Sequence, residues 1–255
     1  MCYTDDARPP LPPIGGAAAE QGDMHLTAAD GNRLMAYFAR AAEPSGAGMV
    51  ILPDIRGLHD FYRELAQRYA EAGINAVAID YFGRTAGDGS RDEGFEWRPH
   101  VEQTTPAGIN ADVRAAVDFL RSGQMGDVKA VFTVGFCFGG AQSWRQSAAG
   151  HGLAGCIGYY GVPARVRDVI PQMEVPLLLL VAGADFTPQD EFQKFDRELT
   201  DAGVPHRMTV YEGAPHSFFD RTFEEHKEAA DDSWRQVLSF VEENLGVSQP
   251  GARRG

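Results

Sequence analysis

The stretch VGFCFGGAQ at positions 134–142 joins an apolar run to a segment with a helical pattern, and it places a cysteine at the junction. Cys137 has a glycine two residues away on each side, Gly135 and Gly139. In a sharp strand-to-helix turn the middle residue is strained, and side chains two positions away would collide with it. The pattern therefore predicts a nucleophile elbow, with the Cys137 sulfur exposed at the end of a buried strand. The helix N-terminus that follows favours the thiolate over the thiol.

A cysteine at this position could instead form a disulfide, bind a metal or simply fill space in the core. The three cysteines, Cys2, Cys137 and Cys156, are too few and too scattered for a disulfide framework. The sequence has no CxxC and no Cys/His cluster at zinc spacing, so we expect no metal. A buried cysteine in a glycine-rich packing turn remains the structural alternative.

The surrounding chain alternates short apolar runs with amphipathic segments. Strands are expected at residues 34–40, 49–54, 75–81, 130–136, 154–161, 176–185 and 206–214. Helices are expected at residues 60–73, 109–123, 141–150, 189–203 and 220–246. This alternation predicts an α/β fold, with a mainly parallel twisted sheet and helices on both faces.

The domain organisation follows from composition along the chain. Residues 1–22 are rich in Pro, Gly and Ala and are expected to form a flexible N-terminal arm. A single domain is expected over 23–246, followed by a flexible tail at 247–255. The one long irregular connection, residues 85–108, is expected to cap the carboxyl ends of the strands, where ligands bind open α/β sheets.

Length and charge exclude several classes of protein. A chain of 255 residues can form one sizeable core. Its 36 acidic and 23 basic residues give a net charge of −13, which disfavours nucleic acid and anionic membranes as partners. The N-terminus has no basic start or apolar signal core, and no run is long enough to span a membrane, so we expect a cytoplasmic protein with reduced thiols.

Two further residues complete a catalytic pattern with Cys137. Asp185 follows the apolar run 176–184, and His216 follows the next expected strand, in the order nucleophile, acid, histidine. We expect His216 to exchange a proton with the thiol and Asp185 to orient the imidazole. His59 and His100 could line the pocket but lack this context.

Four motifs, GFCFGG (135–140), GYYG (158–161), AGADFTP (182–188) and APHSF (214–218), occur in an order that resembles the dienelactone hydrolase (carboxymethylenebutenolidase) family of the α/β-hydrolase superfamily. The resemblance covers most of residues 24–245. It implies a cofactor-free hydrolase that acts on small lactones or esters through a Cys-His-Asp triad and a thioester acyl-enzyme. The implied substrates are dienelactone-like compounds from aromatic-ring degradation. A general small-ester carboxylesterase and a non-catalytic ligand-binding relative are the alternatives. The glycine spacing of GFCFGG excludes a dinucleotide-binding motif.

The resemblance also implies residues around the triad. Asp54 stands where the family has a glutamate that pairs with the resting thiol and regulates it; the alternative is a strand-end cap. Backbone N–H groups of Ile55 and Phe138 would form the oxyanion hole.

The substrate is expected to contact Arg84, Arg221 and Trp97. Arg84, in IDYFGR, matches the family's carboxylate-binding arginine. The second family arginine falls on Asp220, with Arg221 one residue later; Arg56 is another candidate to replace it.

We expect the protein to be a monomer or a homodimer.

Overall fold

The computed structural model describes residues 4–246, which form an eight-stranded sheet with the order β1-β2-β4-β3-β5-β6-β7-β8. The strands are Ala18–Thr27 (β1), Arg33–Ala41 (β2), Ala47–Leu52 (β3), Asn75–Ile79 (β4), Ala130–Phe136 (β5), Gly155–Tyr159 (β6), Leu177–Ala184 (β7) and His206–Pro215 (β8). β1 pairs antiparallel with β2, and β2 antiparallel with β4; every other neighbouring pair is parallel. The predicted mainly parallel α/β sheet is confirmed.

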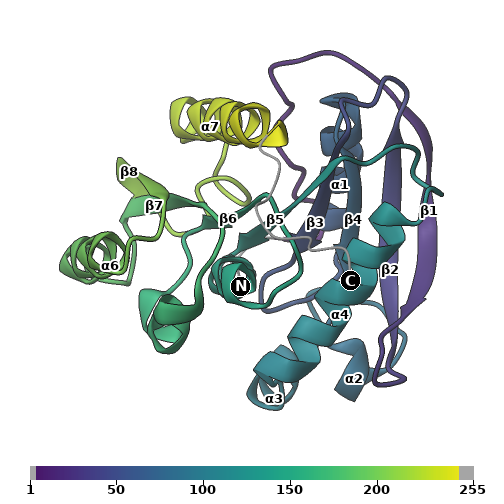
Figure 1. Cartoon of the computed structure of the whole chain (residues 1–255), viewed down its shortest axis with the longest axis horizontal. Coiled ribbons are helices and arrows are strands. Elements are labelled where there is room, and N and C mark those ends of the chain that lie inside the picture. The colour runs from purple at the N-terminus through teal and green to yellow at the C-terminus, as the bar shows by residue number, and fades with distance from the viewer. Residues whose placement is uncertain (1–3, 247–255) are drawn as a thin grey trace, which may run out of the picture.

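Helices cover both faces of this sheet (Figure 1). They are Asp60–Glu71 (α1), Gly83–Ala86 (α2), Trp97–Glu102 (α3), Pro106–Arg121 (α4), Phe138–Arg145 (α5), Gln189–Asp201 (α6) and Lys227–Leu245 (α7). In Figure 1, α1 and α7 lie above the sheet and α4 and α6 below it. Each layer has its own apolar core, with Phe61 and Trp234 in one and Trp144 and Phe195 in the other. β3 and β5 are buried on both sides because they run between these layers, which explains their continuous apolar runs.

The first strand is a correction to the expected arm. β1 has the polar sequence AAEQGDMHLT and is mostly exposed, so it lacks the apolar run that marks an inner strand. Its pairing with β2 extends from Ala18 to Thr27. Residues 18–22 therefore belong to the sheet and not to a flexible arm.

The residues before β1 also contact the domain. The Pro10 carbonyl accepts a hydrogen bond of 3.1 Å from the indole N–H of Trp234 on α7, and Asp5 forms ion pairs described below. The described part of the arm is thus packed against the fold. Residues 1–3, including Cys2, and the expected tail at 247–255 lie outside the described residues.

Two kinds of feature are absent from residues 4–246. None of their helices combines the length and the apolar character needed to cross a bilayer. No group of three His, Cys, Asp or Glu side chains in this part of the chain is placed to hold a metal ion.

Candidate active site

Cys137 lies between β5 and α5, the strand-turn-helix context that the motif requires. Its φ is 55°, in the left-handed region that a residue with a side chain rarely adopts. A β-carbon added at Gly135 would overlap the carbonyl oxygen of Gly139, and one added at Gly139 would overlap the carbonyl oxygen of Leu52. The two glycines are therefore required by backbone packing around the turn.

His216 and Asp185 meet at the same edge of the sheet. They follow the neighbouring strands β8 and β7, and His216 Nδ1 lies 2.8 Å from Asp185 Oδ2. The Asp185 side chain is 1% exposed and that of His216 is 17% exposed. The other carboxylate oxygen of Asp185 accepts the backbone N–H of Thr187 at 3.2 Å. The carboxylate thus orients the imidazole through Nδ1, so proton exchange with a reacting group falls to Nε2.

Two aromatic rings flank the imidazole of His216. The ring centroids of Tyr160 and Phe186 lie 4.8 Å and 4.6 Å from that of His216. Phe186 is 70% exposed, while Tyr160 is buried and has a φ of 39°. The imidazole is therefore held from one side by the core and from the other by an exposed ring that a ligand could cover.

A pocket of about 410 Å³ opens over Cys137 and His216. Six of the residues predicted from the sequence line it: Ile55, Trp97, Cys137, Phe138, His216 and Arg221. Trp97 and Val101 come from α3, so the segment 85–108 contributes one wall, as expected for a cap. The rest of the lining, including Val162, Arg165 and Phe186, was missed.

Arg165 is the unpredicted residue with the clearest chemical role. It lies in a short 3₁₀ turn after β6, and its guanidinium carbon is 5.5 Å from the centroid of the Phe138 ring. Its carbonyl accepts a hydrogen bond of 2.7 Å from Arg145, which fixes the turn. Among the described residues, no carboxylate lies within ion-pair distance of Arg165. The signal available in the sequence was its position shortly after GYYG, at the carboxyl end of a buried strand.

Arg84 lies elsewhere, which corrects the expectation that it binds the substrate. Its guanidinium forms ion pairs with Asp112 on α4 at 2.8 Å and with Asp30 at 2.6 Å. Asp112 is fully buried, so Arg84 neutralises a carboxylate within the fold. It does not line the pocket.

Asp54 follows β3 and is fully buried. Its Oδ1 accepts the backbone N–H of Arg56 at 2.9 Å, and its own N–H donates to the Tyr62 hydroxyl at 3.1 Å. These bonds fix the turn that carries Ile55, as the strand-end alternative predicted. Ile55 and Cys137 both line the pocket.

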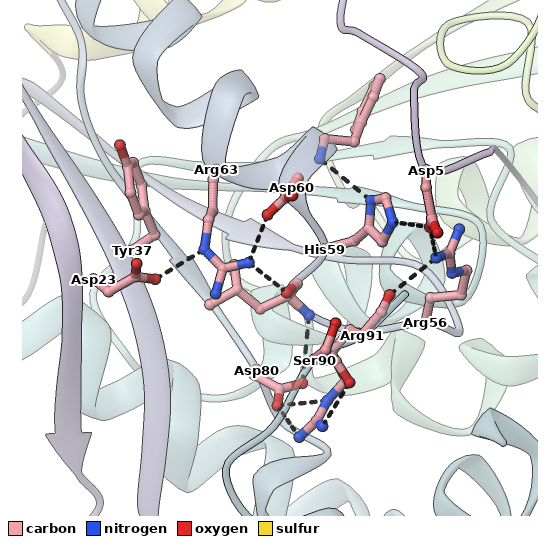
Figure 2. A network of polar contacts seen from close by, with 12 residues as sticks. Asp5, Asp23, Tyr37, Arg56, His59, Asp60, Arg63, Asp80, Ser90 and Arg91 are labelled. Carbon is pink, nitrogen blue, oxygen red and sulfur yellow. Dashed lines mark hydrogen bonds and ion pairs between the residues drawn. The ribbon is translucent and has the colours of Figure 1, made fainter. Parts of the chain in front are cut away.

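A polar network includes Arg56, which follows this turn (Figure 2). Arg56 and His59 are buried, and Asp5 bridges them at 2.7 Å and 2.8 Å. His59 also caps α1, because its ring accepts the N–H of Phe61. Burial lowers the pKa of His59, against the opposing effect of Asp5. Arg56 and His59 therefore serve the turn, and neither lines the pocket.

Arg91 links the cap segment to the same network. Its guanidinium pairs with the buried carboxylate of Asp80 at 2.7 Å, and its carbonyl accepts a bond of 3.0 Å from Arg56. His100, on α3, stacks on Phe95 with the two rings 9° from parallel. It does not line the pocket.

Asp220, at the position expected to be an arginine, is 1% exposed. It accepts hydrogen bonds from the Tyr160 hydroxyl at 2.8 Å and from the backbone N–H of Arg221. Burial, and then the charge of Asp54, raise the pKa of Asp220 to about 8. The next residue, Arg221, is among the residues that line the pocket.

The second described cysteine has a different environment. Cys156 lies on β6 and is fully buried. Burial raises the pKa of its thiol to about 12. Cys137, the other described cysteine, is partly exposed and lines the pocket.

Comparisons with known proteins identify the family of the chain. The sequence model of the dienelactone hydrolase family matches residues 34–245. A carboxymethylenebutenolidase of Rhodococcus opacus is 28% identical over 264 residues, which cover 97% of this chain and 98% of that protein. Curated relatives at similar identity include the protein usf of Aquifex pyrophilus, 26% identical over 88% of this chain and 99% of its own.

Solved structures show the same fold. A dienelactone hydrolase-like promiscuous phosphotriesterase from metagenomic libraries superposes with a TM-score of 0.74 at 24% identity, over 90% of this chain and 99% of that one. An esterase of Pyrococcus furiosus superposes with a TM-score of 0.66 at 17% identity, over 94% and 100% of the two chains. The family match covers most of the domain, including all four motifs. The chain belongs to the dienelactone hydrolase family and is a hydrolase of the ester and lactone class.

Proposed function

We propose that this hydrolase cleaves small lactones or esters that carry an anionic group, through a Cys137-His216-Asp185 triad and a thioester intermediate. The observation that carries the proposal is the strained turn at Cys137, in one pocket with a histidine that a buried aspartate orients. A residue is kept in so unfavourable a conformation only where the surrounding structure over-determines it, as at active sites.

The reaction has two acyl-transfer steps. His216 takes the thiol proton of Cys137, the thiolate attacks the carbonyl carbon, and a C–S bond forms as the carbonyl π electrons move onto oxygen. Backbone N–H groups of Ile55 and Phe138 stabilise this oxyanion; the Phe138 N–H is in the first turn of α5, where no intrahelical acceptor exists. The C–O bond then breaks, and the leaving alkoxide or enolate takes a proton from the His216 imidazolium.

Deacylation reverses these roles with water. His216 takes a proton from water, the hydroxide attacks the thioester carbonyl, and the C–S bond breaks to release the acid and restore the thiolate. Asp185 keeps its charge throughout and stabilises the imidazolium formed in each step. The triad and the two backbone N–H groups supply every group that this scheme requires, so the proposal includes no cofactor.

The pocket lining supports a compact substrate with apolar parts and an anionic group. Trp97, Val101 and Phe186 supply apolar walls around the sulfur. Arg165 and Arg221 add two guanidinium groups to a protein whose net charge is −13. A planar carboxylate matches a guanidinium in geometry, so these two residues replace Arg84 as the proposed anion-binding pair. Dienelactone-like compounds from aromatic-ring degradation fit this description.

The resting thiol also has a proposed partner. Asp54 follows β3 at the edge where Cys137 lies, and in our proposal it restrains the thiol until substrate enters. Asp54→Ala should then make Cys137 more sensitive to peroxide, measured as the rate of loss of alkylatable thiol. Unchanged sensitivity would count against this restraint and leave Asp54 its structural role in the turn after β3. A reduced thiol nucleophile also fits the cytoplasmic location we propose.

The test is a steady-state hydrolysis assay on a dienelactone and on p-nitrophenyl acetate, with Cys137→Ala alongside. Dienelactone turnover that is lost in the variant supports both the mechanism and the substrate class. Cys137-dependent turnover of the acetate alone would keep the triad and favour a general carboxylesterase. If Cys137→Ala leaves both activities unchanged, the proposed nucleophile is wrong. If the wild type turns over neither substrate and Cys137 reacts with iodoacetamide no faster than a model thiol, a ligand-binding role takes its place.

A further inference from the structure

A second hollow, of about 200 Å³, adjoins the pocket of the proposed active site. The two share the residues Phe138 and Arg165, so they meet at this pair of side chains. The smaller one lies where the start of α4 meets α5, and Thr105, Gln142 and Arg145 also line it. We call it the side hollow.

Gln142 is the residue of the side hollow whose side chain makes no bond within the fold. It is 7% exposed. Its backbone carbonyl accepts a bond of 3.2 Å from the side chain of Gln146, but no described residue forms a hydrogen bond with its side-chain amide. On α5, Gln142 is one turn after Phe138 and one turn before Arg145, so the three share the face of the helix that lines the side hollow. A buried amide without a bond in the fold is unfavourable unless a ligand completes it.

The side hollow also favours negative charge. Two of the described residues that line it, Arg145 and Arg165, carry a guanidinium, and none is an Asp or Glu. Arg145 is paired with Asp168, whereas no described carboxylate lies within ion-pair distance of Arg165. The 16-residue helix α4 starts here at Pro106, and the N-terminal end of a helix carries a partial positive charge. In a protein with a net charge of −13, this is a place where an anion is favoured.

We propose that the side hollow is a second subsite of the active site, in which Gln142 and Arg165 bind the distal carboxylate of a substrate whose ester carbonyl lies at Cys137. This inference rests on the proposed function and specifies its substrate class. The Gln142 amide donates to one carboxylate oxygen, and the guanidinium of Arg165 donates to the other. Gln142 is thus a specificity-determining residue that contacts no reacting atom.

The position of Gln142 on α5 sets the length of the substrate. Gln142 follows Cys137 by five residues, which corresponds to about 7.5 Å along the helix. The two carboxyl carbons of an extended adipic acid chain are about 6 Å apart, and a hydrogen bond of about 2.9 Å spans the remainder. Half-esters and lactones with a six-carbon dicarboxylic skeleton therefore fit, whereas an acetyl group reaches only the first pocket.

The first test compares two esters of equal length. They are the p-nitrophenyl monoester of adipic acid and p-nitrophenyl hexanoate, in which a methyl group replaces the carboxylate. Gln142→Leu should lower the ratio of their kcat/KM values, adipate over hexanoate, by about 10-fold or more. Gln142→Glu should lower it further, because two carboxylates then repel each other. Gln124→Leu, at an exposed glutamine that lines neither hollow, is the matched control and should keep the wild-type ratio. A wild-type ratio in both Gln142 variants would overturn the proposal.

Urea unfolding separates binding from a structural role. Gln142→Leu should unfold at the wild-type urea concentration or a higher one, because leucine is of similar size and removes an amide that makes no bond in the fold. An earlier transition with an unchanged substrate ratio would show that the amide serves the fold, which would refute the proposal. If Gln142→Leu does not fold, the substrate ratio of Gln142→Glu decides.

Binding of adipate, measured by calorimetry on the full chain without any ester, tests the subsite apart from hydrolysis. We expect weaker binding in Gln142→Leu than in the wild type, and wild-type binding in Gln124→Leu. Equal binding, or none, in both the wild type and Gln142→Leu would refute the subsite even if esters are cleaved through Cys137. If no ester is cleaved while Gln142→Leu still weakens adipate binding, the proposed function fails and the anion subsite stands.

Discussion

The guanidinium of Arg165 lies over the ring of Phe138, with its central carbon 5.5 Å from the ring centroid. Phe138 supplies one of the two N–H groups of the proposed oxyanion hole. A substrate whose carbonyl oxygen binds there can therefore place an anionic group against Arg165.

Arg165→Gln should raise KM for a carboxylated ester by about 10- to 100-fold, because a hydrogen bond between charged groups contributes about 1.5–3 kcal/mol. Turnover of p-nitrophenyl acetate should change little. Arg114→Gln, at an exposed arginine on α4, is the matched control. An equal loss on both esters would remove the anion-binding role of Arg165.

Asp185→Asn should lower kcat by about 10³- to 10⁴-fold, because an amide no longer fixes the Nδ1 proton or stabilises the imidazolium. The variant should fold normally and keep its substrate affinity. Asp190→Asn, five residues later at the exposed start of α6, controls for the loss of charge. Retention of more than a tenth of the activity would show that His216 is oriented by something else.

Gly139→Ala should destabilise the protein by about 3 kcal/mol or more, since its new methyl group meets the backbone of β3, which cannot move aside. Gly15→Ala, where a methyl group meets nothing within 4 Å, should be close to neutral. The measurement is urea unfolding at pH 7. Similar midpoints for the two variants would contradict the close packing of the elbow.

Asp5→Ala should lower the melting temperature, because it removes the ion-pair partner of buried Arg56 and His59. Asp6→Ala, beside it and exposed, is the control. Hydrogen bonds from His59 and then Arg56 lower the pKa of Asp5. A lowered carboxyl pKa stabilises the folded state above the unfolded pKa, and the effect is lost as pH falls through the folded value. The difference between the two variants should therefore shrink in acid.

Asp220→Asn should flatten the dependence of stability on pH. The pKa of Asp220 is about 8 in the folded state and near 3.8 when unfolded, so the unfolded chain releases this proton first as pH rises. The wild type should thus lose up to about 1.4 kcal/mol per pH unit relative to Asp220→Asn between pH 4 and pH 8. Parallel stability curves over this range would contradict the raised pKa.

The sequence predicted the inner part of the sheet well. β5 has the predicted bounds, 130–136, because a strand covered on both faces must be apolar throughout. β1 was missed for the converse reason. As an exposed edge strand it is stabilised by pairing with β2, and its own residues carry no apolar pattern.

The residues of the candidate site also fall into two groups, those that a sequence pattern indicates and those that it does not. Cys137, His216 and Asp185 were predicted because each follows a buried strand in a fixed order, and the structure places His216 beside Asp185 and in one pocket with Cys137. Arg84 has that context too, but its side chain turns toward Asp112, a partner on α4 that only the tertiary structure reveals. Arg165 and Tyr160 were missed because their roles depend on which ring they contact, Phe138 for one and His216 for the other.

The contrast between the two described cysteines has a practical consequence. Cys156 is fully buried in the sheet, and burial raises the pKa of its thiol to about 12. Cys137, in contrast, lines an open pocket. With Cys2 replaced by serine, a single equivalent of a thiol-specific dye should mark the protein at one place. The amount of dye bound would then count working enzyme molecules in any preparation, and competing compounds could be ranked by how far they slow the labelling.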